Sequence, residues 1–192
     1  PVVRRAVHAP HLTSISASSF VLWNRCPACW RAVFRQGFQD RRENFSGEET
    51  PGGPRTGELL HWALALWDYT PQQLELILRP DGPLVPPLHL RSLWREPRTK
   101  SWIRQLIEGF TTLPSFKMAC QAKLSGTLER EKPLRLDRPD NLALTGIADI
   151  TWTDGACRFI RDYKTGNFHA AAQEDAVQQL RFYGTILRRT AP

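Results

Sequence analysis

The chemically richest part of the sequence is LTGIADITWTDGACRFIRDYKTGN, residues 144–167, which contains Asp149, Asp162 and Lys164. If these three side chains share one face of a β-hairpin, the two carboxylates are diagonal neighbours, with Cα atoms about 7–8 Å apart. A divalent cation at about 2.0–2.1 Å from one oxygen of each carboxylate fits between them. The ammonium group of Lys164 points the same way, so the spacing predicts a metal site in which a lysine accompanies two acids.

The hairpin is predicted by Asp154 and Gly155, a residue pair that tolerates the positive φ angles of a two-residue turn. With this turn, Asp149 lies directly opposite Ile160, and alternation places both on the face that carries Asp162 and Lys164. The opposite face is apolar and is predicted to face the core; it carries Leu144, Ala148, Ile150, Trp152, Cys157, Phe159 and Tyr163. A solvated polar face explains the same spacing without a metal, because antiparallel sheets commonly leave one face in water.

The elements around the hairpin are read from helical periodicity and capping residues. Ser16 or Ser18 is expected to cap the first helix, and Pro27 to kink or restart it. Residues 116–129 have strand-like stretches, and residues 130–141 are predicted to be an exposed, charged connection. Helices are predicted at 13–38, 57–70, 101–113 and 168–189. Helices, then strands, then a helix indicate an α/β or α+β fold around a small mixed β-sheet flanked by helices.

Composition limits the class of protein. The 192 residues are 41% hydrophobic and 23% charged, which is typical of one soluble globular domain spanning 1–192. No apolar run approaches about eighteen residues, so we expect no membrane span, and the absence of a signal-like start favours a cytoplasmic location. The net charge of +7 favours a polyanionic partner, nucleic acid first. The first residue is not methionine, which suggests a processed chain or a piece of a longer protein.

Two motifs in the hairpin region, GIAD (146–149) and DYKTG (162–166), resemble the core of the PD-(D/E)XK nuclease superfamily. Three further stretches resemble its RecB-type exonuclease branch, which includes the CRISPR-adaptation nucleases. They are SASSF through Trp30 (16–30), GELLH (57–61) and QLRFY (179–183), in the order of that branch. The resemblance covers residues 14–187 and implies a restriction-endonuclease-like core.

The resemblance assigns roles residue by residue. Asp149 and Asp162 match the metal-binding acids, the backbone carbonyl of Tyr163 would add a ligand, and His61 matches the metal-binding histidine. Lys164 matches the catalytic lysine. Taken alone, His61 between Leu60 and Trp62 is better read as a hydrogen-bonded core histidine.

Further residues are assigned to the edge of the site. Gln179 and Tyr183 lie four apart on a helix face, where family members hold the DNA backbone or orient the lysine; helix packing of Tyr183 and a solvated Gln179 are the alternative. Glu129 lies near the position of an acid at the site's edge, although Arg130 and Glu131 make a plain charged loop equally plausible. Basic residues expected to bind phosphates are Arg158, Lys123 and Arg181.

The implied function is a divalent-metal-dependent DNA nuclease, with exonuclease action in DNA repair, recombination or related processing. Mg²⁺ or Mn²⁺ is the expected cofactor, and the imidazole of His61 favours Mn²⁺. The expected partners are single- or double-stranded DNA and a helicase or another repair or CRISPR protein. The alternative is a non-catalytic DNA-binding or scaffold domain of the same fold.

The four cysteines are predicted to be small buried hydrophobic residues outside any disulfide framework. Cys26 matches the first position of a [4Fe–4S] cluster in the RecB branch, but the three downstream cysteines are missing from this chain as given, so no such cluster is expected. Cys26 and Cys29 form a C-x-x-C motif, which leaves a zinc-linked nucleic-acid-binding protein as a third possibility.

Overall fold

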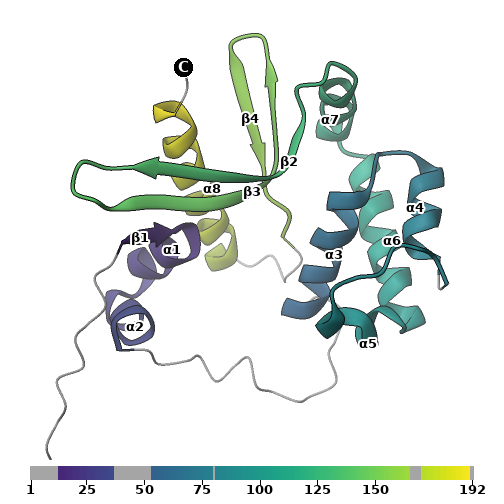
Figure 1. The fold of residues 1–192 in the computed structure, drawn as a ribbon, viewed down its shortest axis with the longest axis horizontal. Helices are drawn as coiled ribbons and strands as arrows, with labels where there is room; N and C mark the ends of the chain where they lie inside the picture. The colour runs from purple at the N-terminus through teal and green to yellow at the C-terminus, as the bar shows by residue number, and fades with distance from the viewer. Residues whose placement is uncertain (1–12, 37–52, 80, 165–169, 191–192) are drawn as a thin grey trace, which may run out of the picture. The chain divides into compact units, whose positions relative to one another are not determined.

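The computed structural model describes residues 13–36, 53–79, 81–164 and 170–190, and it confirms an α/β fold with a four-stranded mixed sheet (Figure 1). The central strand is β3 (Ala143–Asp154), whose neighbours in the strand order are β1 (Ser14–Ser16) and β2 (Glu129–Asp137). Strand β1 pairs with β3 in parallel, and β4 (Cys157–Arg161) pairs with it in antiparallel. The long β3 therefore connects every part of the sheet.

The chain divides into two compact units. The first comprises residues 1–45, 133–147 and 173–192, and the second comprises residues 46–132 and 148–172. Strands β2 and β3 each contribute residues to both units. The organisation of 1–192 as a single domain stays a prediction. Among the described helices, none has the length and apolar character that a membrane crossing requires.

The first unit contains α1 (Ala17–Arg25), α2 (Pro27–Trp30), the π-helical turn η1 (Arg31–Arg35) and most of α8 (Ala170–Arg189). The Ser16 side chain accepts a hydrogen bond from the Ser19 backbone N–H at 3.1 Å, which confirms the N-cap. Pro27 opens α2, as its fixed φ favours, and so interrupts the helix. Residues 14–16, predicted as helical, instead form β1, because their backbone pairs with Ala143–Thr145 far along the chain.

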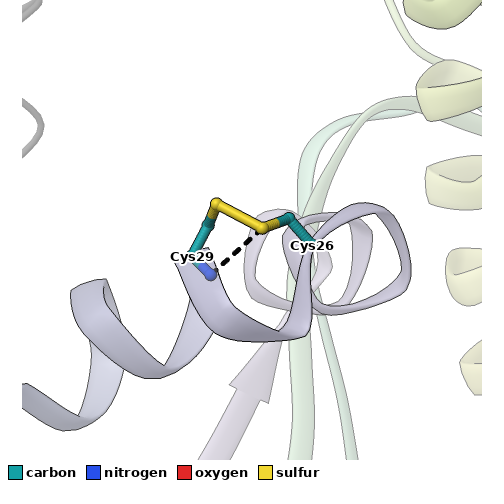
Figure 2. Close-up of a disulfide and its surroundings, with 2 residues drawn as sticks. All are labelled: Cys26 and Cys29. Atoms are coloured by element: carbon teal, nitrogen blue, oxygen red, sulfur yellow. Dashed lines mark hydrogen bonds between the residues drawn. A yellow bond between two sulfur atoms is a disulfide. The ribbon is translucent and has the colours of Figure 1, made fainter.

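Cys26 and Cys29 are joined by a disulfide between α1 and α2 (Figure 2). One turn of helix brings their Cα atoms to 5.2 Å, a separation that a disulfide spans. The Cys29 backbone N–H also donates to the Cys26 sulfur at 3.1 Å. The prediction of unpaired cysteines is therefore wrong for this pair, and the prediction of burial is wrong for Cys157, which is unpaired but exposed beside the hairpin turn.

The second unit is largely helical: it contains α3 (Pro54–Leu66), α4 (Pro71–Leu78), the 3₁₀ turn η3 (Leu88–Leu90), α5 (Arg91–Trp94), α6 (Pro97–Thr111) and α7 (Pro114–Leu124). Four of these helices begin with proline, whose missing N–H is harmless in a first turn. Their buried side chains form one apolar core with Ile150 and Trp152 of β3. The prediction of strand-like structure from residue 116 is wrong, because Ala119 and Ala122 are buried at helical spacing on α7.

Strand β2 ends at Asp137, so the charged connection predicted for residues 130–141 is wrong up to residue 137, whereas residues 138–141 form an exposed turn. The charged side chains of β2 alternate with more buried ones, and Leu134 is only 4% exposed. Pro133 is tolerated because β2 ends the strand order at one side of β3, where one row of backbone groups needs no partner. Because this edge strand contains many charged residues and a proline, its composition resembles that of a loop.

The hairpin register differs from the predicted one by two residues. Asp154 pairs with Cys157, and Thr151, rather than Asp149, lies opposite Ile160. The turn is therefore Gly155-Ala156, with Gly155 at φ +57°, which matches turns that require glycine at the first central position. A shift of two residues preserves the faces, so Ile150 and Trp152 are buried as predicted.

Gly146 tests how the first unit packs around β3. A Cβ atom at Gly146 would lie 2.5 Å from Cε1 of Tyr183, whose ring is 3% exposed and cannot move freely. Gly146→Ala is expected to lower the free energy of unfolding by about 1–3 kcal/mol in urea denaturation. The matched control is Gly184→Ala on α8, which meets no atom within 4 Å and is expected to be neutral or stabilising by up to about 1 kcal/mol. Equal effects of the two substitutions would contradict this packing.

Candidate metal centre

Asp149 is the buried acid of the second unit. It lies on β3 and is 7% exposed, between the fully buried residues Ala148 and Ile150. One carboxylate oxygen, Oδ1, lies 3.1 Å from Nδ1 of His61, and the other, Oδ2, accepts the backbone N–H of Tyr163 at 2.5 Å. Both oxygens are therefore oriented by partners from different elements, α3 and the segment after β4.

Three ligand types converge around this carboxylate. His61 on α3, Glu131 on β2 and Asp149 on β3 each offer a ligand atom, and these atoms lie within 4.8 Å of one another. Burial raises the pKa of Glu131, and the neighbouring Asp149 raises it further. An imidazole nitrogen with two carboxylates is a donor set that fits a divalent cation such as Mn²⁺ or Mg²⁺. A bound cation would also relieve the repulsion between the two acids.

The position of His61 fits both of its predicted roles. Its side chain is 33% exposed, and its Nδ1 faces Asp149. The hydrogen bond to Asp149 raises the pKa of His61, whereas burial lowers it. The ring is hydrogen-bonded and also offers a ligand atom beside two acids, so its role as a metal ligand stays a prediction.

Asp162 and Lys164 form an ion pair next to this group. Nζ of Lys164 lies 2.5 Å from Oδ2 of Asp162, whose side chain is only 5% exposed. Burial raises the pKa of Asp162, and Lys164 opposes that effect. Asp162 is not one of the three residues whose ligand atoms converge, so its role as a metal ligand, like that of the Tyr163 carbonyl, stays a prediction.

A cavity of about 500 Å³ lies over these residues. This volume is in the range of small-molecule and substrate sites, about 300–1,000 Å³. It is lined by Pro54, Gly57, Glu58, His61, Glu131, Tyr163 and Lys164. The histidine, one acid and the lysine therefore open into one space.

Glu131 is a candidate metal ligand that the sequence analysis did not identify. The predicted acid of the site's edge, Glu129, is instead paired with Lys132 and accepts the Thr151 hydroxyl at 3.3 Å. Both acids of β2 reach β3: Glu129 accepts the Thr151 hydroxyl, and a carboxylate oxygen of Glu131 lies within 4.8 Å of one of Asp149. Glu131 has a φ angle of +45°, so regular strand alternation does not predict the direction of its side chain.

The remaining predicted residues are not among the three whose ligand atoms converge. Arg158 is exposed on β4 opposite Thr153, and Nζ of Lys123 contacts Asp68. Gln179, Arg181 and Tyr183 lie on α8, in the first unit. There the Gln179 side-chain amide donates to the Tyr183 hydroxyl at 2.7 Å. Their contribution to a site stays a prediction.

The fold and the centre together define a class of protein: an α/β domain with a histidine, acids and a lysine gathered beside a central strand. A family model described as the PD-(D/E)XK nuclease superfamily matches residues 14–192. The chain belongs to this superfamily, whose members are generally metal-dependent nucleases. No curated protein and no solved structure shows a significant match to the chain.

Removal of Glu131 tests the metal centre directly. We expect Glu131→Gln to weaken Mn²⁺ binding by about tenfold or more, because affinity for such cations depends on the number of charged oxygen ligands. Isothermal titration calorimetry measures this change. Glu129→Gln is the matched control on the same strand and is expected to leave the affinity unchanged, since Glu129 binds Lys132 and Thr151. Equal weakening by both substitutions would place the cation elsewhere.

Proposed function

We propose that this protein is a divalent-metal-dependent deoxyribonuclease that hydrolyses phosphodiester bonds at the His61, Glu131 and Asp149 centre. The observation that carries the proposal is the convergence of these three ligand types within 4.8 Å in a member of a nuclease superfamily. The lysine of the family motif, Lys164, opens into the same cavity. A scaffold that had lost catalysis would have no need to retain this set.

The chemistry requires charge neutralisation at the phosphate and an activated water. A divalent cation held by His61, Glu131 and Asp149, with Asp162 as a further acid, would polarise the phosphate and lower the pKa of a bound water. Asp149 keeps its own orientation through the hydrogen bonds to His61 and the Tyr163 N–H. These contacts hold the acid in place before substrate arrives, which reduces reorganisation during the reaction.

Lys164 is the proposed catalytic lysine. Its ammonium group is held at 2.5 Å from Asp162, on the exposed side of that buried acid. In this position it can orient the attacking water or offset the negative charge that develops on the phosphate. Tyr163 and Asp162 fix the backbone on its N-terminal side, so the position of the lysine follows from the hairpin.

The finer parts of the proposal concern substrate and context. The net charge of +7 favours DNA as a polyanion, with Arg158, Arg181, Gln179 and Tyr183 as proposed backbone contacts. Hydrolysis is expected to leave 5′-phosphate and 3′-hydroxyl ends. The resemblance to the RecB branch supports exonuclease action in DNA repair or recombination, with a helicase or CRISPR protein as partner.

A cleavage assay on four substrates tests the function: linear and circular DNA, each single- and double-stranded, with Mg²⁺, Mn²⁺ or EDTA. We expect cleavage only with metal, and Asp149→Asn and Lys164→Ala are each expected to slow it by about 10²–10³-fold. Sparing of both circular substrates would support exonuclease action. Lys117→Ala, at an exposed lysine of α7, is the control and should cleave as the wild type does.

Two outcomes would contradict the proposal. If folded wild-type protein binds Mn²⁺ but cleaves none of the four substrates, the non-catalytic DNA-binding reading replaces it. If Lys164→Ala cleaves at the wild-type rate, the lysine is not part of the chemistry.

A further inference from the structure

An apolar hollow lies in the first unit, between the first strand and the helices α1 and α2. Its volume is about 320 Å³, and its walls are Ile15, Ser19, Phe20, Trp23 and Trp30. Trp23 is 44% exposed, although large apolar side chains normally avoid water. The hollow therefore presents flat aromatic surface that the described residues leave open.

The aromatic rings around the hollow are held in fixed positions. Trp30 is 8% exposed, and its indole N–H donates to the Ser19 hydroxyl at 2.6 Å. Trp23 meets Trp30 edge-on with ring centroids 4.9 Å apart, and Phe34 stacks on Trp30 at 6.0 Å. Phe34 is itself 37% exposed. One buried tryptophan thus positions two exposed aromatic rings.

The covalent structure reinforces this arrangement. The disulfide between Cys26 and Cys29 closes the turn that separates Trp23 from Trp30 (Figure 2). The closed turn limits how far the two tryptophans can separate. A surface that is fixed in advance loses less conformational entropy when it binds a ligand.

The charges on this segment have one sign. Residues 13–36 include Arg25, Arg31 and Arg35 and contain no aspartate or glutamate. The Arg35 guanidinium lies 5.9 Å from the centre of the Trp30 ring. Arg25 is paired with Asp175 of α8 at 3.0 Å, whereas Arg31 and Arg35 are exposed. Aromatic faces rimmed by cations match a ligand that combines flat rings with negative charge.

We propose that this aromatic hollow binds unpaired bases of single-stranded DNA, with Trp23 as the stacking platform and Arg31 and Arg35 as contacts for backbone phosphates. Proteins that bind single strands combine stacking aromatic residues with a cationic surface in this way. A duplex hides the faces of its bases, so the hollow discriminates single strands from duplexes. The assignment rests on the proposed function, because it gives the nuclease a second contact with its substrate.

The test measures binding without cleavage. The full chain is titrated in EDTA into fluorescently labelled oligothymidine of about 20 nucleotides, and anisotropy reports the affinity. Trp23→Ala is expected to weaken binding about tenfold, which lies within the range of effects of losing one stacked base. An abasic strand of the same length keeps the phosphates but lacks the bases. We expect the wild type to bind this strand with about the affinity that Trp23→Ala has for oligothymidine.

Two further variants separate stacking from simple apolar contact. Trp23→Phe keeps a flat ring and is expected to bind within about twofold of wild type, whereas Trp23→Leu keeps apolar bulk and is expected to behave like Trp23→Ala. Leu124→Ala, at an exposed leucine of α7 in the second unit, is the control for loss of apolar surface and should not change binding. Circular dichroism confirms that each variant is folded.

Three results would overturn the assignment. One is wild-type affinity in both Trp23→Ala and Trp23→Leu, and another is equal binding of the abasic and normal strands by the wild type. The third is a wild-type dimer that Trp23→Ala dissociates without any change in DNA affinity, which would make the hollow a contact between copies. Because EDTA removes the metal, each result is independent of whether the metal centre cleaves DNA.

Discussion

The second unit depends on how the carboxylate of Asp149 is accommodated inside the protein. A buried carboxylate without partners destabilises a fold by several kcal/mol, because it gives up its hydration. Here His61 and the backbone N–H of Tyr163 replace water at its two oxygens. Helix α3, strand β3 and the end of the hairpin must therefore all reach their final positions before the acid is satisfied, so the geometry of the metal centre forms together with the fold.

Tyr163 connects this polar arrangement to the apolar core. Its N–H binds Asp149, while its ring meets Phe110 of α6 edge-on at 5.4 Å. The guanidinium of Arg161 lies over the same Phe110 ring at 4.5 Å. Alternate residues after the hairpin turn thus anchor in the core, and the residues next to them, Asp162 and Lys164, point towards the centre. Packing of Tyr163 and Arg161 is what holds the ion pair of Asp162 and Lys164 in place.

Sequence periodicity was sufficient for features that depend on local chemistry. The N-cap at Ser16 and the faces of the hairpin follow from residue type and alternation, whereas His61 is grouped with Asp149 only through the family resemblance. Periodicity failed where pairing with a strand far along the chain determines the secondary structure. Strand β2 has the composition of a loop and becomes a strand only beside β3, and for that reason Glu131 was missed and Glu129 was chosen. The two-residue error in register had a similar origin. Gly155 can occupy the second position of an Asp154-Gly155 turn or the first position of a Gly155-Ala156 turn, and only the structure distinguishes them.

The chain as a whole is positively charged, whereas its candidate metal centre is acidic. The two charges act over different distances. The chain carries a net charge of +7, yet the raised pKa values of Glu131 and Asp162 show that negative charge is disfavoured at the centre by burial and, for both residues, by the proximity of Asp149. A positive surface attracts a polyanion over distances of about a Debye length, whereas a metal ion is selected by the few acids in contact with it. A nuclease needs both interactions, and they do not cancel, because the first acts at long range and the second only at the ligand atoms. The acids of the centre are therefore gathered beside β3, where their ligand atoms can reach one cation.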